Sequence, residues 1–450
     1  MTNSNVITRE VQIKNICDRG IVFAFCAIIY FLPISIALLD SFAGLAIFFY
    51  ALKKISGIVF VWKSQISPLR FSDKIIFVLK SLGPIPNVLN RPIGILALVI
   101  FISALHSQYL TLSLFAFVGK FSKGIFLYFS FIEVFVTQKR IRLFLVVFLM
   151  SAFLVALSGI IEHYIGIDFI RGHHLTGGQI SSSFSFANSL GDYLLFPLGI
   201  VSYLVYRLFL KQKLFLLRGI LTVLFVMLIV CLGWTYCRGA WVGFIFLLLC
   251  MILRDKRKIF YGLALLTIFI LLFESSLHHV RHVSLFKDNV SSLSEKNIME
   301  FLQQGGSGRS IFWKNAIFIT EHYPFWGSGL NTYARMLDRY SMSPWYAHNS
   351  YLQMAAEIGV IGLSCFLWLL FVLFRRGFMA LNQIGDTGAK PVLEGTLAGM
   401  AGFLVASFFD TTLHEVQLGV LFWLMLGLLV SQMHLNLPPK ESLTVFDKGR

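Results

Sequence analysis

Long apolar stretches alternate with short polar ones along almost the whole chain. The runs 260–273 (FYGLALLTIFILLF) and 364–374 (SCFLWLLFVLF) contain no charged residue. A helix needs about 20 predominantly apolar residues to cross the hydrocarbon layer of a bilayer. The pattern therefore predicts about twelve membrane spans, near 21–39, 42–62, 92–106, 109–137, 143–165, 188–208, 214–234, 239–254, 257–274, 349–374, 393–410 and 416–433. The fourth carries Lys120 and Lys123, so its first half could lie in the membrane interface.

The cations between these spans predict an orientation. Twelve spans place both termini on one side, and that side holds 27 of the Lys and Arg residues against nine on the other. Cytoplasmic loops carry such an excess, so both termini are expected in the cytoplasm. The chain then divides into an N-terminal bundle of about nine helices (1–274), one long periplasmic loop (275–347), C-terminal spans (348–433) and a cytoplasmic tail (434–450). The first span, 21–39, shows no clear cleavage site at its end and is expected to be retained.

Composition agrees with this architecture. Hydrophobic residues make up 57% of the chain and charged residues 13%, against about 25% charged in soluble domains. This excludes a soluble globular domain and a disordered chain. The net charge of +16 does not indicate nucleic-acid binding, because the cations cluster between apolar runs. Most of the cysteines fall inside those runs, which excludes a disulfide scaffold.

The long loop has helical patterning in its second half. Apolar residues at Ile311, Phe312, Ala316, Ile317 and Ile319 recur at helical spacing. This predicts an amphipathic helix that lies on the membrane or caps a cavity. Pro324 and the Gly327–Gly329 segment should end it, and a second short helix is expected from Asn331 to Tyr340.

Arg238, in TYCRGAWVG, stands where one apolar span ends and the next begins. An arginine at the edge of the hydrocarbon is costly and is a candidate functional residue. Its guanidinium offers a bidentate fork to a phosphate. The alternative is a side chain that reaches to the interface without a chemical role.

Two further residues have a chemical and an ordinary interpretation. His348 opens the tenth span directly after the long loop, where a neutral imidazole is suited to general-base catalysis; a lone interfacial histidine can also be structural. Arg309 follows GGSG at the start of the expected loop helix, where free backbone N–H groups favour an anion. It could equally be a solvated loop arginine.

The 166–187 segment and the start of the sixth span contribute polar candidates. Arg171 lies in this segment, and Asn188 and Asp192 share one helix face. These two side chains could bind a sugar hydroxyl or simply cap the helix. His278, His279 and His282 have metal-like spacing, but no carboxylate set accompanies them, so no metal site is expected.

Taken together, the motifs RGAW (238–241), GRSIFWKNAI (308–317), YPFWGSGLNTY (323–333) and HNSYLQMAAEIGVIGL (348–363) resemble the O-antigen ligase and polymerase superfamily of envelope glycosyltransferases. Cys237 stands where members of that superfamily often carry Ser. The resemblance implies an all-α fold of the glycosyltransferase C superfamily type, with an extracytoplasmic cavity roofed by the long loop.

The same resemblance implies a reaction. A glycan passes from undecaprenyl diphosphate to an acceptor hydroxyl, a lipid A-core sugar in a ligase, with inversion and without a metal or other cofactor. Arg238 and Arg309 would bind the diphosphate and His348 would accept the proton. Glycan contacts are expected among a wider set of polar residues, namely Arg171, Asn188, Asp192, Asn349 and Glu357.

Other functions share parts of this pattern. An O-antigen polymerase and a protein O-oligosaccharyltransferase use the same donor chemistry with different acceptors. A solute transporter also fits twelve spans. In a transporter we would expect broken helices with charges at mid-membrane, whereas here the charges of interest lie at the outer face. We therefore expect a membrane enzyme of the bacterial inner membrane, with lipids and lipid-linked glycans as its partners.

Overall fold

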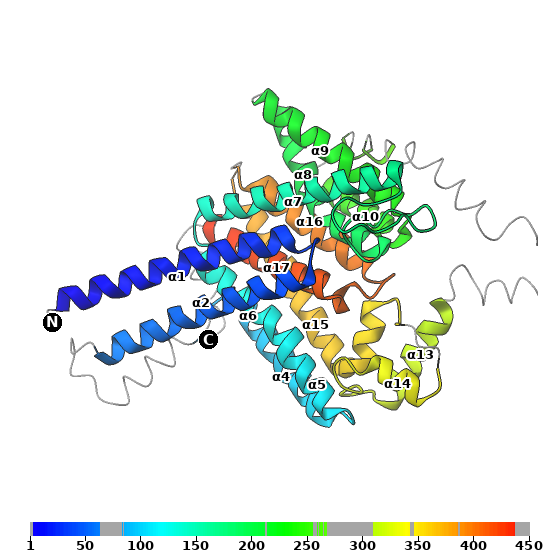
Figure 1. Ribbon diagram of the computed structural model, residues 1–450, viewed down its shortest axis with the longest axis horizontal. Helices are drawn as coiled ribbons and strands as arrows, with labels where there is room; N and C mark the ends of the chain where they lie inside the picture. Colours follow the sequence, from blue (N-terminus) through cyan, green and yellow to red (C-terminus); the bar gives the residue numbers. More distant parts are fainter. Residues whose placement is uncertain are drawn as a thin grey trace, which may run out of the picture.

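The computed structural model describes residues 3–63, 83, 85–211, 214–254, 259, 261–263, 265–267, 309–342, 346–385 and 388–436. This part of the chain is helical and contains no β-strand (Figure 1). The main helices are α1 (Asn3–Phe31), α2 (Ile36–Lys63), α4 (Asn90–His106), α5 (Leu110–Ala116), the π-helical η1 (Phe117–Ser122), α6 (Lys123–Val134), α7 (Gln138–Ile165), α8 (Ala187–Lys211), α9 (Phe215–Trp234), α10 (Arg238–Arg254), α13 (Arg309–His322), α14 (Tyr333–Arg339), α15 (Ser350–Gln383), α16 (Lys390–Ala406), the 3-10 turn η4 (Thr412–His414) and α17 (Val416–Asn436).

Seven helical segments are long and apolar enough to cross a membrane. They are α2, the continuous α5–η1–α6 segment, α7, α8, α9, α15 and α17, and the shorter α4 and α10 are also apolar. This architecture is that of a polytopic, all-helical membrane protein. The figure of about twelve spans stays a prediction, and the span expected at 257–274 falls largely outside the described residues.

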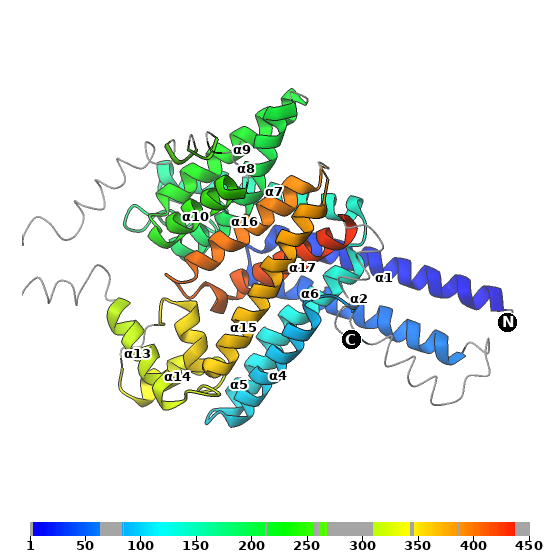
Figure 2. The ribbon, with the colours of Figure 1, turned by 180° about the vertical axis from the view of Figure 1, so that it is seen from behind.

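Helix α16 crosses α8 and α10 at very short range, and α16 and α17 lie in the middle of the bundle (Figure 2). A Cβ atom on Gly395 of α16 would lie 2.5 Å from the carbonyl oxygen of Gly199 in α8. Any larger residue would force the two backbones apart, as is usual where transmembrane helices pack through small residues. The crossing fixes the start of α8 against the end of α16.

Helix α15 is broken at Gly359, whose φ of 72° is not helical. The segment before α14 fills the break with main-chain hydrogen bonds. The N–H of Val360 donates to the Pro324 carbonyl at 2.8 Å, and the N–H of Ser328 donates to the Ala356 carbonyl at 2.9 Å. These two α15 groups would bond each other in an unbroken helix, so the loop takes over an i to i−4 pair.

The two helices expected in the long loop are confirmed. Helix α13 ends at His322, two residues before Pro324, and α14 covers Tyr333–Arg339 within the expected 331–340. The polar first part of the loop, 281–306, lies outside the described residues.

The starts of α8, α10 and α15 meet the end of α16 at one end of the bundle, which we call the site end. There the Ser350 N–H donates to the Ser407 carbonyl at 2.9 Å, and Asn188 contacts Asp410. Helices α13 and α14 gather beside the start of α15 (Figures 1 and 2). Residues from five distant parts of the sequence are thereby brought together.

Candidate active site

His348 is held by the residues on both sides of it. Its backbone has a φ of 47°, in the left-handed region that is uncommon for a residue other than glycine and that clusters at functional sites. The next residue, Asn349, is the N-cap of α15: its side-chain oxygen accepts from the N–H groups of Tyr351 and Leu352, each at 3.0 Å. The cap fixes where α15 begins and therefore where the imidazole lies.

The imidazole of His348 pairs with a carboxylate that the sequence analysis did not single out. Nδ1 lies 3.1 Å from Oδ1 of Asp410, in the turn after α16. A carboxylate at this nitrogen orients the ring and holds the proton on Nδ1, which leaves Nε2 as the basic nitrogen. The His348–Asp410 pair therefore has the geometry that a general base and an orienting carboxylate require, and the catalytic role of His348 remains a prediction.

Asp410 is fixed as firmly as the histidine. Its carboxylate accepts from the Thr411 N–H at 2.8 Å and from the Asn188 amide, while its carbonyl accepts from the Ser350 hydroxyl at 2.9 Å. Burial by itself would raise the pKa of this carboxyl, but the hydrogen bonds and charge supplied by His348, Thr411 and Asn188 outweigh it and lower the pKa. Asp410 is therefore an ionised partner for His348 at neutral pH.

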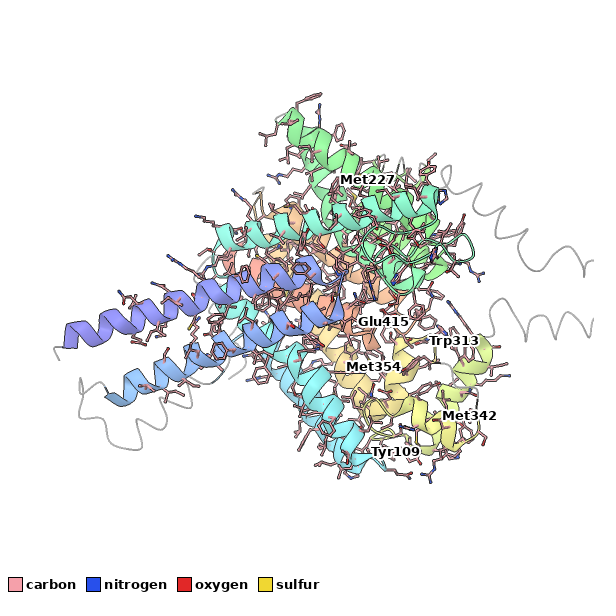
Figure 3. All side chains as sticks on the ribbon, viewed as in Figure 1. Tyr109, Met227, Trp313, Met342, Met354 and Glu415 are labelled. Carbon is pink, nitrogen blue, oxygen red and sulfur yellow. The ribbon has the colours of Figure 1, made fainter. Side chains whose placement is uncertain are left out.

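Helix α13 covers this pair. The Phe312 ring lies 5.5 Å from the His348 ring, and Trp313 lies 5.5 Å from Phe408, just before Asp410. Figure 3 shows Trp313 on α13 and Glu415 toward the centre of the molecule. The expectation that this helix caps a site is consistent with these contacts.

Arg309, the first residue of α13, approaches α8 and α10. Its charge acts on Asp192 of α8 and on Cys237, the residue before α10. Arg238 follows Cys237 as the exposed first residue of α10. The two arginines selected from the sequence therefore both lie toward the start of α10 at the site end.

Asp192 is the most deeply placed acid of the group. Its side chain is buried, and neither carboxylate oxygen has a hydrogen-bond partner among the described residues. Asn188, one turn earlier on the same face, contacts Asp410 instead of capping its own helix. The expectation of glycan contacts at these two residues remains a prediction, but Asn188 already has a positioning contact.

Glu415 is a second acid that the sequence analysis missed. Its carboxyl accepts from the Ser189 hydroxyl at 2.8 Å. Burial is the main cause that raises the pKa of Glu415 to about 7; the Ser189 hydrogen bond opposes this shift and the nearby Asp410 charge adds to it. The site end therefore contains one ionised acid and one acid that titrates near neutrality.

Glu357 faces away from this cluster and is 2% exposed. Its carboxylate accepts from the N–H groups of Asn331 at 2.9 Å and Tyr333 at 3.3 Å. The Nε2 atom of His414 lies 3.2 Å from the same carboxylate. With its oxygens engaged in this way, Glu357 braces the loop. Asn349 is fully buried, and its side-chain nitrogen has no hydrogen-bond partner among the described residues. A glycan contact at either residue remains a prediction.

Arg171 belongs to a separately organised loop before α8. Its guanidinium donates to the Ser183 carbonyl at 3.1 Å. Asp168 orders the loop by accepting from the N–H groups of Arg171 at 2.9 Å and His173 at 2.7 Å. A glycan contact at Arg171 remains a prediction.

In the part of the chain that the structure describes, no three His, Cys, Asp or Glu side chains are grouped to hold a metal ion. His278, His279 and His282 lie outside that part. Independence from metals therefore stays a prediction, to be tested by experiment.

The fold is that of a helical membrane protein, and its site end brings together a histidine, a carboxylate and two arginines. A family model described as O-antigen ligase matches residues 223–367, which include Arg238, Arg309 and His348. This match confirms the resemblance drawn from the motifs: the segment is O-antigen ligase-like, and the family indicates a glycosyltransferase-like enzyme of O-antigen processing. No curated protein sequence matches the chain significantly.

Proposed function

We propose that the protein is an O-antigen ligase-type glycosyltransferase that moves a glycan from undecaprenyl diphosphate to a hydroxyl of a lipid A-core sugar. The observation that carries the proposal is the His348–Asp410 pair, 3.1 Å apart, roofed by the helix that begins at Arg309. The site end would face the periplasm, with both termini in the cytoplasm, as the distribution of cations predicts.

The proposed reaction is a single displacement with inversion. Nε2 of His348 accepts the proton of the acceptor hydroxyl as its oxygen forms a bond to the anomeric carbon. The bond from that carbon to the diphosphate oxygen breaks, and the lipid diphosphate leaves with the electron pair. Arg238 and Arg309 stabilise the charge that develops on the diphosphate, as fixed cations do in a site from which water is excluded.

Asp410 supports this step without touching substrate. When His348 accepts the proton, its imidazole becomes a cation, and an ionised carboxylate at Nδ1 stabilises that cation. Two fixed guanidiniums can serve the leaving group without a metal, so transfer should continue in the presence of a chelator. A loss of activity restored by Mg²⁺ or Mn²⁺ would contradict that role of the arginines.

The acceptor decides between a ligase and its alternatives. Purified protein in lipid nanodiscs would receive the lipid-linked glycan with lipid A-core, with a second lipid-linked repeat only, or with an acceptor protein. Glycan on lipid A-core supports the ligase proposal. A longer lipid-linked glycan with no transfer to lipid A-core would identify a polymerase, and glycan on protein an O-oligosaccharyltransferase. Uptake of a solute without any transfer would support a transporter.

A further inference from the structure

A cavity of about 130 Å³ borders α15, and its lining includes neither His348 nor Asp410. Its walls come from α4, η1, α15 and α17, and most are apolar. They include Leu96, Ile100, Phe121, Phe366, Phe422 and Trp423. Such a lining suits a hydrocarbon chain rather than a sugar.

One end of the cavity is polar. Lys120, Asn331, Glu357 and His414 lie there. Glu357 and His414 bond each other at 3.2 Å, and Glu357 also accepts from backbone N–H groups. The acid is thus already satisfied, which leaves Lys120 as the charge that the cavity offers to a ligand.

Lys120 stands inside a largely apolar segment that is long enough to span the membrane and that also carries Lys123 and Glu133. Its side chain is exposed on the surface of the bundle. It belongs to the π-helical turn η1, a distortion often found at functional sites. Its Nζ donates to the Asn331 side-chain oxygen at 2.7 Å, a neutral partner. Among the described residues no carboxylate lies within ion-pair distance of it, whereas Lys123, one turn on, is 2.6 Å from Asp40.

A lysine at such a position is costly unless it binds an anion or reaches water. An ammonium at the polar end of an apolar cavity is complementary to a phosphate carried by a lipid. We propose that this cavity binds a phosphorylated lipid, with its phosphate at Lys120 and a hydrocarbon chain between α4 and α17. Asn331, from the loop before α14, would close over the phosphate.

The position of the cavity indicates whether its occupant is the donor lipid or the acceptor lipid. This step rests on the proposed function. Arg309 is the first residue of α13, whose Phe312 ring lies 5.5 Å from the His348 ring, so the donor diphosphate belongs beside His348. Neither Arg309 nor His348 lines the Lys120 cavity, whose polar end contains the Glu357–His414 pair. A ligase must hold two lipid-borne substrates at once, and the site end and the Lys120 cavity provide separate cations for them. The occupant is therefore the acylated, phosphorylated acceptor.

The test measures binding directly. Full-length protein in nanodiscs receives bisphosphorylated lipid A that carries a diazirine on an acyl chain, and the crosslinked peptides are mapped after irradiation. We expect labels on the α15 and α17 segments around Phe366 and Trp423. Lys120→Gln should weaken labelling about tenfold or more, the usual weight of a charge-assisted hydrogen bond. Lys123→Gln, which removes a paired cation in the same helix, should leave it unchanged.

Competition identifies the source of the lipid. Dephosphorylated lipid A and phosphatidylglycerol should compete poorly, and undecaprenyl diphosphate should not compete at this cavity. Equal labelling of Lys120→Gln and wild-type protein would overturn the proposal, as would equally effective competition by phosphatidylglycerol, which would make the occupant an ordinary membrane lipid. Effective competition by undecaprenyl diphosphate would assign the cavity to the donor and overturn the choice of acceptor.

A transfer assay separates this inference from the proposed function. In a working ligase, Lys120→Gln should raise the KM for lipid A-core and leave kcat and the KM for the donor little changed. Wild-type protein that labels at the cavity but transfers no glycan would contradict the ligase proposal and leave the phosphorylated-lipid site standing. Normal acceptor KM in Lys120→Gln would count against the site.

Discussion

Two histidine–carboxylate pairs flank the start of α15, with nearly the same geometry and different surroundings. His348 lies 3.1 Å from Asp410, and His414 lies 3.2 Å from Glu357. In the first pair the His348 side chain is 29% exposed and the Asp410 side chain 14%. The Asp410 carboxylate also accepts hydrogen bonds from Thr411 and Asn188. The Glu357 side chain is 2% exposed and accepts from two backbone N–H groups of the loop.

The difference shows that the pair itself does not define a catalytic function. In both pairs a carboxylate orients an imidazole. In the first, the ring lies beneath α13 among groups that can bind substrate. In the second, the remaining ring nitrogen, Nδ1 of His414, is buried and has no hydrogen-bond partner in the described part of the chain. We therefore expect the first pair to control turnover and the second to control stability.

The largest expected effect is at His348. Replacement by Ala should lower kcat by about 10²–10⁴-fold, the usual contribution of a general base, and leave donor binding nearly unchanged. His414→Ala is the matched comparison and should retain most of the kcat of the folded protein at saturating acceptor, since His414 lines the proposed acceptor cavity. Membrane-inserted protein would be quantified first for each variant. Near-normal transfer by His348→Ala, or an equal loss in His414→Ala, would abolish the distinction between the pairs.

Arg309 should have the next largest effect. Arg309→Ala should reduce kcat by about 10²–10³-fold, as the loss of one preorganised transition-state donor does, and should also weaken donor binding. Lys should restore little, because a point charge cannot reproduce a bidentate fork on phosphate; the same holds at Arg238. Arg335→Ala, which removes an exposed arginine from α14, serves as the control. Full activity of Arg309→Lys would show that the fork is not needed.

Asp410→Asn should give a smaller loss, about 10- to 100-fold in kcat, below the 10²–10⁴-fold that general-base catalysis contributes as a whole, because the base itself remains. The pKa of Asp410 lies below its ordinary value, so the substitution removes a charge at neutral pH and disfavours the histidine tautomer with basic Nε2. The acidic limb of the pH–rate profile, which reports protonation of the general base, should move with it. An unchanged profile with reduced expression would instead indicate a purely structural role.

Glu357→Ala tests the second pair and should act mainly on stability. Removal of one partner of a buried pair costs about 3–5 kcal/mol, so we expect a clear fall in the unfolding temperature measured in detergent. Glu357→Gln retains an acceptor for the loop N–H groups and should be milder. The activity per folded molecule should change less than in Asp410→Asn. A larger loss of activity in Glu357→Ala than in Asp410→Asn would contradict the assignment of catalysis to the His348–Asp410 pair.

The smallest expected effect concerns Glu415 and pH. Its pKa is raised to about 7 from an ordinary 4.5, chiefly by burial, so the folded protein binds a proton more tightly than the unfolded chain does. The stability linked to this proton is complete below about pH 4.5 and is lost as pH rises through about 7. Over this range the wild type should lose on the order of 1–3 kcal/mol relative to Glu415→Gln. If the free energies of unfolding of the wild type and Glu415→Gln changed with pH in the same way across this range, the prediction would be contradicted.

The sequence was most informative where function follows from local pattern. Arg238, Arg309 and His348 stand at the ends of apolar runs or beside a glycine-rich turn, and the two loop helices follow from apolar spacing and from Pro324. The structure places all of them in or beside the site end. Each of these signals lies within about 15 residues of sequence, which is the range over which such patterns are readable.

Asp410 and Glu415 were missed because their role depends on packing between distant segments. They follow α16, and only the crossing of α16 with α8 brings them to His348 and Ser189. A signal was present, since two acids and a histidine stand between two expected spans on the same side as His348. The contacts of Glu357 with the loop could not be predicted for a related reason: spacing along α15 could not show that the loop returns to the Gly359 break and covers it.

That break also constrains how the protein can be made. The carbonyls of Ala356 and Glu357 accept from Ser328 and Gly329, residues synthesised earlier and separated from them by α14. Without the loop, α15 would have to form an unbroken helix or leave these peptide groups without partners, a state that lipid tolerates poorly. The break in α15 and the docking of the loop should therefore form together, as one cooperative step.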